Sequence, residues 1–236
     1  MLLESLRQEV LHANQEISRR GLAPHTFGNA SGIDRSGAQP LVVIKPSGVD
    51  YASLKPADLV VTDLDGKIVE GALRPSSDLD THTLLYREFP QIGGIVHTHS
   101  VYATAFAQAG LPVPALGTTH ADFFFGDIPV TRKLRKSEIA AAYEIETGRV
   151  IRETFAGRDP GDMPAVLVNR HAPFAWGPTA AKAVENAVAA ELCARLAFYT
   201  LRLAPSGPTL EKALLDRHFR RKHGAAAYYG QRPDGR

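Results

Sequence analysis

The stretch DLVVTDLDGKIVEG, residues 58–71, constrains the fold more than any other part of the sequence. Two short runs rich in β-branched residues flank Asp65-Gly66, a dipeptide that favours the tight turn of a β-hairpin. The run LVVIKPSG, residues 41–48, predicts a further strand that ends in a loop. Because these strands follow one another directly along the chain, at least part of the sheet is predicted to be antiparallel.

The remaining chain alternates between helical and extended patterns. Apolar residues at helical spacing before Gly21 predict a helix over residues 2–20. The same reasoning predicts helices over residues 79–89, 100–109, 135–154, 179–203 and 208–222. Extended segments are predicted over residues 92–99, at FFFG (123–126) with its neighbours, and at AVLVNRHAPFAW (165–176). Hairpins combined with helices favour a single three-layer α/β domain, with helices flanking a central, mostly antiparallel sheet, over a doubly wound parallel sheet.

The composition narrows the classes of function. A chain of 236 residues, 44% of them hydrophobic, can bury one large core. A net charge of +2 with scattered basic residues argues against nucleic acid, so a small molecule is the expected partner. The charged start, MLLESLRQEV, and the lack of an apolar run of ~18 residues predict a cytoplasmic protein that does not span a membrane. The single cysteine, Cys193, is expected to be an inert buried thiol.

Two histidines stand one residue apart in GGIVHTHS, residues 93–100. Because alternate side chains of a strand share a face, His97 and His99 are predicted to point together. Such a pair is either a hydrogen-bonded surface pair or part of a metal site. A catalytic zinc commonly has three protein ligands and an open position, and His171, which follows AVLV, is the best candidate for the third ligand. By itself, His171 would be interpreted as a hydrogen-bonded histidine beside the loop predicted within HAPFAWG.

Several short polar stretches suit an anion. Ser76, Ser77 and Asp78 precede a predicted helix, where they would form an N-cap and where hydroxyls and free amides also bind anions. The loops predicted at GNAS (28–31) and KPSG (45–48) add an amide, a lysine and small residues that could hold a phosphate. Each tetrapeptide is also an ordinary turn pattern.

Two further stretches have both a structural and a functional interpretation. TTHADFFFG combines Thr118, His120 and Asp122 with an aromatic run that is typical of a core. RHFRRKHGAAAYYGQ is typical of a basic helix end followed by a frayed tail. Its two adjacent tyrosines are more apolar than a disordered tail usually is, which suggests that the tail docks.

Taken together, these motifs closely resemble L-ribulose-5-phosphate 4-epimerases, a family of the class II aldolase and epimerase superfamily. The resemblance predicts one domain over residues 1–231, with an extra tail, RPDGR, at 232–236. It rests on these motifs, in the family's order and spacing: FGNAS, IKPSGVDY, RPSSD, GGIVHTHS, GTTHADFF, YEIETG, HAPFAWG and RKHGAAAYYGQ. The segment FAGRDPGDMP is slightly short and NR precedes the third histidine, but neither departure changes a motif residue.

The resemblance implies a divalent metal, usually zinc, on His97, His99 and His171, with Asp78 at or near the coordination sphere. It implies that the substrate phosphate is held by Asn29, Lys45, Ser47, Gly48, Ser76 and Ser77. It implies that the site is completed, partly from a neighbouring subunit of a cyclic homotetramer, by Thr118, Asp122, Glu144, His218 and Tyr229. Of these, Asp122 and Tyr229 would be the acid and base.

The implied reaction inverts C4 of L-ribulose 5-phosphate and gives D-xylulose 5-phosphate. Because the C4 proton is not acidic, bond cleavage is the expected route. Loss of the C4 hydroxyl proton would break the C3–C4 bond and leave an enediolate and glycolaldehyde phosphate, which rotates and is attacked on its other face. A metal would serve as Lewis acid and template, and firm phosphate contacts would retain the aldehyde.

Two other functions fit parts of this pattern. A metal-dependent sugar-phosphate aldolase of the L-fuculose-phosphate type would share the site, although AAAYYGQ and TTHADFF favour the epimerase. A non-catalytic, adducin-like interaction domain would share the fold, but such domains lack the metal histidines. L-ribulose 5-phosphate and L-xylulose 5-phosphate both fit as substrates, and a histidine set accepts several divalent ions.

Overall fold

A single seven-stranded sheet organises the computed structural model, which describes residues 1–207, 209–224 and 227–230. The strand order is β4-β3-β2-β1-β5-β7-β6. Every pair of neighbouring strands is antiparallel, which confirms the predicted sheet. The strands are β1 (Asn29–Asp34), β2 (Leu41–Ile44), β3 (Val60–Asp63), β4 (Ile68–Glu70), β5 (Gly94–His97), β6 (Ala165–Leu167) and β7 (Pro173–Gly177).

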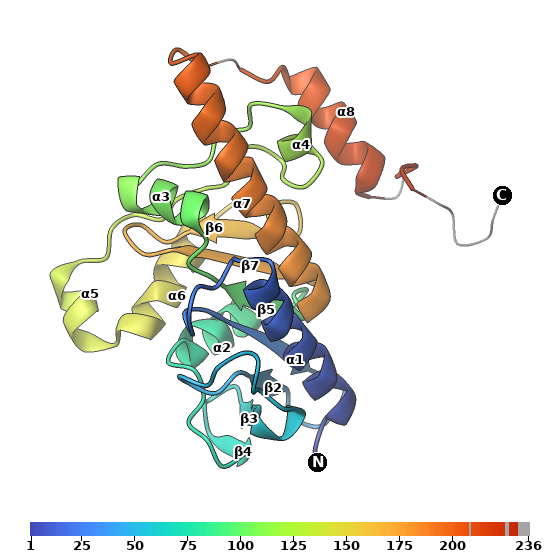
Figure 1. Ribbon diagram of the computed structural model, residues 1–236, viewed down its shortest axis with the longest axis vertical. Helices are drawn as coiled ribbons and strands as arrows, with labels where there is room; N and C mark the ends of the chain where they lie inside the picture. Colours follow the sequence, from blue (N-terminus) through green and yellow to red (C-terminus); the bar gives the residue numbers. More distant parts are fainter. Residues whose placement is uncertain (208, 225–226, 231–236) are drawn as a thin grey trace.

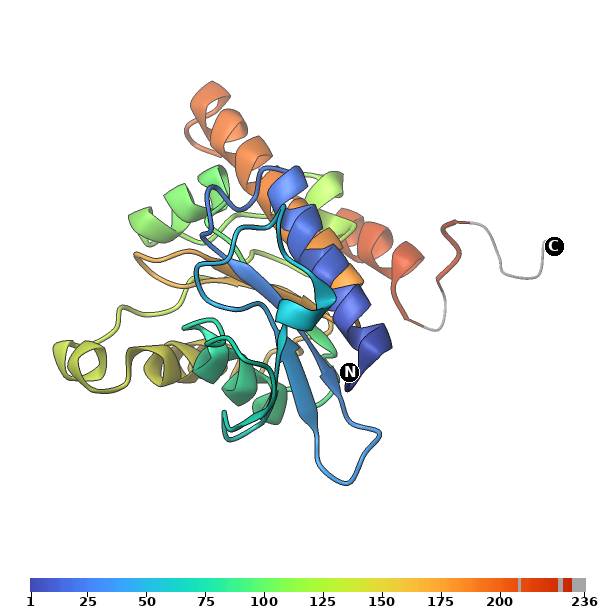
Figure 2. The same cartoon turned by 60° about the horizontal axis from the view of Figure 1, so that its bottom comes forward.

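Helices cover both faces of this sheet, as predicted for a three-layer domain. Figures 1 and 2 show α1 and α7 together on one face, with α2 and α6 on the other. The short α4 lies against α8 near the far end of α7 (Figure 1). The helices are α1 (Glu4–Arg19), the 3₁₀ turn η1 (Pro56–Asp58), α2 (Leu79–Glu88), α3 (Val101–Ala109), α4 (Thr118–Ala121), α5 (Lys136–Ala141), α6 (Tyr143–Thr154), α7 (Ala180–Leu203) and α8 (Lys212–Lys222).

The core is built around the central strand β5. Its Ile95 and Val96 are fully buried because helices cover both faces of the sheet at this strand. On the side of α2 and α6, Phe89, Phe155 and Trp176 form an aromatic cluster with ring centroids 5.0–5.6 Å apart. In the described part of the chain, no helix is both long enough and apolar enough to span a bilayer.

The predicted hairpin is confirmed, because β3 and β4 pair across the turn at Asp65-Gly66. Gly66 has φ +80°, the left-handed conformation for which glycine is favoured at such a turn. The predicted strand over residues 41–48 is β2 followed by a loop, and most predicted helices match α1, α2, α3 and α7.

The prediction of an extended FFFG segment was wrong. The chain forms α4 and then a tight turn, in which the His120 Nε2 lies 2.8 Å from the Gly126 carbonyl oxygen. Phe124 is fully buried beneath this turn, whereas Phe123 is only partly buried. Hydrophobicity correctly indicated a core residue here, but the local hydrogen bonds favour a turn over a strand.

The helix predicted over residues 135–154 is interrupted. Ala142, with φ −133° and ψ 76°, separates α5 from α6. The helix predicted over 208–222 begins only at Lys212, and residue 208 lies outside the described part of the chain.

Two segments predicted as loops belong to the sheet. Asn29 of the GNAS segment pairs with His97 at the start of β1, so a residue expected in a loop lies on a strand. The HAPFAWG segment forms β7, which pairs with both β5 and β6. Pro173 is tolerated because it is the first residue of the strand, where its missing N–H leaves most of the ladder intact. AVLVNRHAPFAW is therefore a hairpin rather than one extended run.

Candidate active site

Three histidines converge at one end of the central strands. His97 ends β5, His99 follows two residues later, and His171 lies in the turn between β6 and β7. One ring nitrogen of each lies within 4.8 Å of those of the other two. The tight turn places His171, because Arg170 adopts a left-handed φ of 61° and its N–H donates to the Ala107 carbonyl at 2.8 Å. The side chains of His97 and His99 thus point together, as their spacing predicts.

The tautomer and protonation state of these imidazoles suit the binding of a cation. The His97 Nδ1 lies 3.0 Å from the Pro173 carbonyl oxygen, which can only accept, so this nitrogen carries the proton and leaves Nε2 free to act as a ligand. Burial lowers the pKa of His97. Burial, reinforced by His97, lowers the pKa of His171 to about 4. At neutral pH both rings are therefore uncharged, the form in which histidine binds a metal.

This donor set fits a divalent metal ion. Three neutral imidazoles at the edge of a polar cavity match the three-ligand arrangement of catalytic zinc sites, which leaves one position open. Within the described residues, the cluster of possible ligands comprises the three histidines alone. Asp78 lines the same cavity without belonging to that cluster.

The cavity itself has a volume of about 260 Å³ and a mostly polar lining. It brings together segments that are distant in sequence, because the loop after β2, the loop before α2 and the start of β1 all meet the histidines. The lining comprises Thr26, Phe27, Gly28, Asn29, Lys45, Pro46, Ser47, Gly48, Ser76, Ser77, Asp78, His97, His99, Tyr143, Glu144 and His171.

The part of the cavity formed by the loop after β2 and the loop before α2 is suited to an anion. Backbone hydrogen bonds join its two loops, from Ser47 N–H to the Arg74 carbonyl and from Ser76 N–H to the Lys45 carbonyl, at 3.0 and 2.9 Å. Lys45 is only 2% exposed, and burial lowers its pKa. Its Nζ makes one long hydrogen bond, 3.3 Å, to a backbone carbonyl. Nζ also lies over the Tyr51 ring, 4.8 Å from its centroid. A buried ammonium with these partners still gains from an anionic ligand.

Asn29 forms hydrogen bonds with two other residues of the cavity. Its Nδ2 donates to Ser76 Oγ at 3.0 Å and to Asp78 Oδ2 at 2.7 Å. Its Oδ1 is buried and has no protein partner among the described residues. The amide therefore holds two cavity residues in place and retains one free acceptor for a ligand hydroxyl.

The other predicted site residues form a separate group around Asp122. The Asp122 carboxylate accepts from His218 Nδ1 at 3.0 Å, from Arg221 at 2.7 and 3.0 Å, and from Lys222 Nζ at 3.2 Å. Partial burial opposes ionisation, but these hydrogen bonds outweigh it and lower the pKa of Asp122. Tyr229 is 61% exposed, and its ring lies 4.5 Å from Lys222 Nζ. Tyr229 thus lies against α8.

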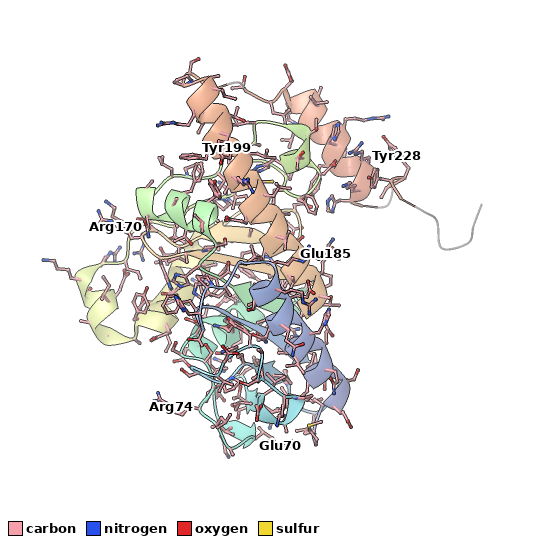
Figure 3. All side chains as sticks on the ribbon, in the orientation of Figure 1. Glu70, Arg74, Arg170, Glu185, Tyr199 and Tyr228 are labelled. Carbon is pink, nitrogen blue, oxygen red and sulfur yellow. The ribbon has the colours of Figure 1, made fainter. Side chains whose placement is uncertain are left out.

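The Asp122 group and the histidine cavity lie apart within one chain. In Figure 3, Arg170, next to the cavity's His171, and Tyr228, next to Tyr229, lie on opposite sides of the molecule. Of the residues expected to complete the site, only Glu144 lines the cavity. Thr118, Asp122, His218 and Tyr229 do not, and Gln231 and the tail at 232–236 lie outside the described part.

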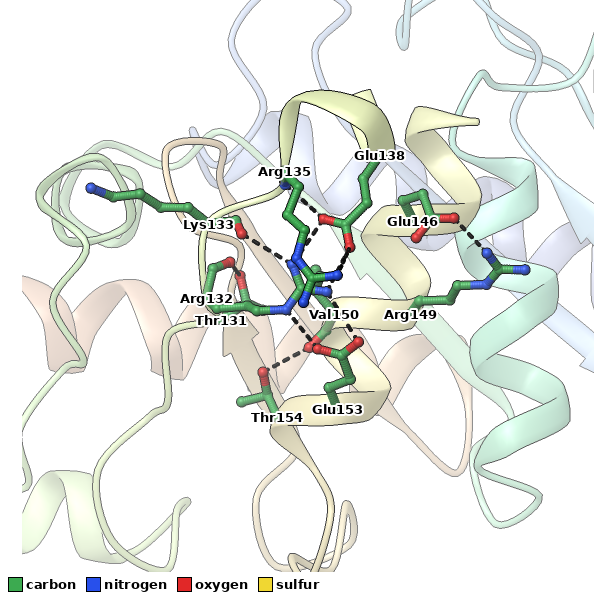
Figure 4. A network of polar contacts seen from close by, with 10 residues as sticks. All are labelled: Thr131, Arg132, Lys133, Arg135, Glu138, Glu146, Arg149, Val150, Glu153 and Thr154. Carbon is green, nitrogen blue, oxygen red and sulfur yellow. Dashed lines mark hydrogen bonds and ion pairs between the residues drawn. The ribbon is translucent and has the colours of Figure 1, made fainter. Parts of the chain in front are cut away.

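An ion-pair network positions the helix that carries Glu144. Arg132 donates two 2.8 Å hydrogen bonds to Glu138 of α5 and bonds of 2.7 and 3.0 Å to Glu153 of α6 (Figure 4). One guanidinium therefore joins both helices. Because α6 begins at Tyr143, this network helps to hold the helix that carries Tyr143 and Glu144. Thr81 of α2 also donates to the Glu144 carbonyl at 2.6 Å.

Two residues that line the cavity, Tyr143 and Phe27, were not predicted from the sequence as site residues. Tyr143 Oη lies 3.2 Å from His171 Nδ1, where it can orient the ring. Phe27 lies beside His99, with ring centroids 5.8 Å apart. Each is the first residue of a recognised motif, YEIETG and FGNAS, but nothing in the local pattern indicates which histidine each one contacts.

The fold and the histidine cavity define a domain of the aldolase type, with three histidines that could hold a metal ion. The chain belongs to the class II aldolase and adducin N-terminal domain family, which it matches over residues 8–198.

Solved structures agree with this membership. The chain is 27% identical to an L-fuculose 1-phosphate aldolase, with a TM-score of 0.76 over 91% of this chain and 94% of that one. It is 26% identical to YgbL, a putative aldolase/epimerase/decarboxylase from Klebsiella pneumoniae, with a TM-score of 0.73 over 92% and 99%. An L-fuculose-1-phosphate aldolase from Thermus thermophilus, 24% identical with a TM-score of 0.66 over 87% and 98%, shares the fold. The class II aldolase fold predicted from the motifs is thus confirmed.

Proposed function

We propose that this protein is a metal-dependent epimerase that converts L-ribulose 5-phosphate to D-xylulose 5-phosphate by breaking and re-forming the C3–C4 bond. The observation that carries the proposal is the cavity itself, where three neutral histidines and an anion-binding end face one space. A pentulose phosphate has matching chemistry, with neighbouring oxygens for a metal at one end and a phosphate at the other. A metal on His97, His99 and His171, zinc by preference, would act as Lewis acid during cleavage.

The chain's own residues hold the substrate at both ends. Lys45, with Ser47, Gly48, Ser76 and Ser77, would bind the phosphate, which prevents the aldehyde fragment from leaving after cleavage. Asn29 Oδ1 would accept a hydrogen bond from a sugar hydroxyl. The retained aldehyde can then turn and expose its other face to the enediolate.

Proton transfer would come from a neighbouring subunit. We infer that Asp122 and Tyr229 are the acid and base, and that they serve the cavity of another copy of the chain, because neither lines the cavity of its own chain. A cyclic homotetramer would repeat this exchange at each interface. Thr118 and His218, which lie near Asp122, would enter the same shared site, whereas Glu144 acts from the chain that holds the metal.

One alternative has support of its own. A sugar-phosphate aldolase of the L-fuculose-phosphate type would use the same cavity, and one such aldolase is 27% identical to this chain. The motifs in the tail and around Asp122 favour the epimerase. An adducin-like, non-catalytic domain is disfavoured, since a purely structural fold has no need for three convergent imidazoles.

A direct assay distinguishes these functions. Purified zinc-loaded protein is incubated separately with L-ribulose 5-phosphate, L-xylulose 5-phosphate and L-fuculose 1-phosphate. The proposal expects D-xylulose 5-phosphate from L-ribulose 5-phosphate, with no solvent deuterium at C4 when the reaction runs in D₂O. If L-xylulose 5-phosphate is the substrate instead, the same inversion gives D-ribulose 5-phosphate. Cleavage of L-fuculose 1-phosphate at a higher kcat/KM would establish the aldolase instead, and deuterium at C4 would rule out the cleavage route.

A further inference from the structure

One apolar side chain is out of place in the polar cavity. Among the described residues that line it, Phe27 is the one large, wholly apolar side chain, and it is 55% exposed. Within the described part of the chain, its ring meets two other rings, those of His25 and His99, each with a centroid separation of 5.8 Å. An exposed phenylalanine next to a metal-type histidine is a surface that a ligand can cover.

Contacts with Tyr51 and with the end of β5 anchor the backbone at Phe27 and Gly28. Tyr51 Oη donates to the carbonyl of Gly28 at 2.7 Å and lies 3.3 Å from that of Phe27. Gly28 has φ +99°, and a Cβ there would lie 2.6 Å from the His97 carbonyl oxygen, so the segment lies directly on the end of β5. Two anchors therefore fix the backbone at Phe27, whose ring lines the cavity beside His99.

The proposed reaction requires that water be excluded from the part of the cavity beside Phe27. Cleavage moves the C3–C4 electron pair into a three-carbon enediolate, while the C4 hydroxyl loses its proton and becomes an aldehyde. If water then protonates C3, the fragment becomes dihydroxyacetone, glycolaldehyde phosphate is released, and the turnover is lost. A site that re-forms the bond must exclude water during this interval. An aromatic ring suits the C–H edge of a sugar and excludes water at the same time.

We propose that Phe27 closes over the sugar carbons beside His99 and shields the enediolate from protonation by water. This inference rests on the proposed function and adds to it a residue that decides between re-addition and abortive release. Phe27 is therefore a substrate-contacting residue, whereas its anchors, Tyr51 and Gly28, are positioning residues.

The first test measures how each turnover ends. Phe27→Ala is compared with wild type and with Val69→Ala, a control at an equally apolar residue that is 50% exposed on β4. The dihydroxyacetone released per D-xylulose 5-phosphate formed should rise roughly 10-fold in Phe27→Ala, as expected for loss of one aromatic contact. In D₂O the released dihydroxyacetone should carry one solvent deuterium. Zinc content should match wild type in both variants, and an unchanged product ratio in Phe27→Ala would contradict the inference.

The second test does not depend on turnover. The chain has one tryptophan, Trp176, which is 1% exposed, so Phe27→Trp adds an accessible indole against a buried background. L-ribulose 5-phosphate should reduce acrylamide quenching of this indole in the zinc-loaded protein, whereas inorganic phosphate alone should not. An indole already shielded without ligand would mean that a neighbouring subunit covers the position, and one that stays exposed with pentulose phosphate would mean that no contact forms. Either outcome overturns the inference.

The two tests separate this inference from the function on which it rests. Shielding of the indole by pentulose phosphate in a protein that epimerises nothing would support the Phe27 contact and refute the epimerase. Normal epimerisation by wild type, combined with wild-type partitioning in Phe27→Ala, would refute the Phe27 contact alone.

Discussion

At the scale of single residues, His97 shows how the sequence prepares a ligand. The residue is 2% exposed, its ring stacks on Phe174 with centroids 4.2 Å apart, and its Nδ1 proton is committed to the Pro173 carbonyl. Burial and the stacking contact restrict the orientation of the imidazole, and the hydrogen bond to Pro173 selects its tautomer. Only Nε2 is left to face the cavity, so little ordering remains to be done when a cation arrives.

This preparation leads to a prediction about metal content. Replacing His97 with asparagine should lower zinc bound per subunit, measured by atomic emission after dialysis, and abolish activity, because one of three ligands is lost. Chelated wild-type protein should regain activity when zinc is added back, whereas His97→Asn should not. His25→Asn, at a histidine outside the cluster, is the control and should retain zinc. Full activity of metal-free wild type would refute the role of the metal.

Tyr229 carries a second prediction at this scale. If its hydroxyl transfers the C4 hydroxyl proton, Tyr229→Phe should lower the epimerisation rate roughly 10²- to 10⁴-fold, the usual contribution of a general acid or base. Zinc content and oligomeric state should not change, because the ring is exposed and lies on α8.

Mixed oligomers then test whether the site is shared. Tyr229→Phe subunits assembled with His97→Asn subunits should form some cavities with both residues intact and recover part of the activity. Near wild-type turnover by Tyr229→Phe would show the tail to be only a frayed end, and mixtures that recover nothing would argue against a site shared between subunits.

At the scale of elements, Gly93-Gly94 lets α7 reach the central strand. A Cβ on Gly94 would lie 2.4 Å from the Cα of Ala180, the first residue of α7. The main chain of the helix start thus rests directly on β5, the strand that ends in His97. The GG of the histidine motif therefore serves packing rather than chemistry.

Gly94→Ala should consequently lower the free energy of unfolding by about 2 to 3 kcal/mol, the range expected for overpacking against backbone that cannot move aside. Urea denaturation measures this change. Gly37→Ala is the matched control, because its Cβ would meet nothing closer than 3.7 Å, and it should stay within about 0.5 kcal/mol of wild type. Equal stability of the two variants would mean that α7 shifts at no cost.

The Arg132 network makes the α5–α6 unit sensitive to acid. Hydrogen bonds from Arg132, supported by one from the Arg135 backbone, lower the pKa of Glu138 from 4.5 to about 2. Because the folded-state pKa is the lower one, the stability that this carboxylate contributes is complete above pH 4.5 and is lost as the pH falls toward 2.

The stability difference between wild type and Glu138→Gln should therefore be largest at neutral pH and shrink steadily below pH 4.5. Urea unfolding at several pH values measures it. In an Arg132→Gln background the same substitution should make little difference at any pH, because the partner is gone. A gap between wild type and Glu138→Gln that does not change with pH would refute the coupling.

At the scale of the whole molecule, the outward face of α7 is unusually apolar. Leu192, Leu196, Tyr199 and Leu203 are 43%, 44%, 46% and 88% exposed. Tyr199, labelled in Figure 3, also pairs with Tyr102 of α3, with their hydroxyl oxygens 3.0 Å apart. A surface of this kind is typical of an interface between subunits. It fits the proposal that a second copy brings Asp122 and Tyr229 to the histidine cavity.

Leu196→Glu should therefore lower the molecular mass in solution, measured by light scattering, and reduce activity, since a charge at the centre of an apolar contact is costly to bury. Zinc content should stay at the wild-type level because the histidines belong to one chain. Ile139→Glu, at an isoleucine of α5 that is 54% exposed, is the control and should leave the mass unchanged. A wild-type mass for Leu196→Glu would exclude Leu196 from the interface.

The sequence alone determined those features that depend on neighbouring residues. The hairpin at Asp65-Gly66, the strand ending in His97 and the helix before Gly21 all follow from turn chemistry and from side-chain periodicity, which act over a few residues. The three histidines could also be predicted from the sequence, because the pair at His97 and His99 indicates a metal site that needs a third ligand.

Tertiary structure decided the features that depend on partners far along the chain. The extended run predicted over residues 165–176 is divided into β6 and β7, and β7 pairs with both β5 and β6. The helix predicted across Ala142 is divided there, and Arg132, remote in the sequence from Glu153, joins the two parts. The separation of Asp122 from the histidine cavity likewise comes from how α4 and α8 pack. The local sequence pattern does not predict these contacts, because they form only when segments distant in the sequence pack together.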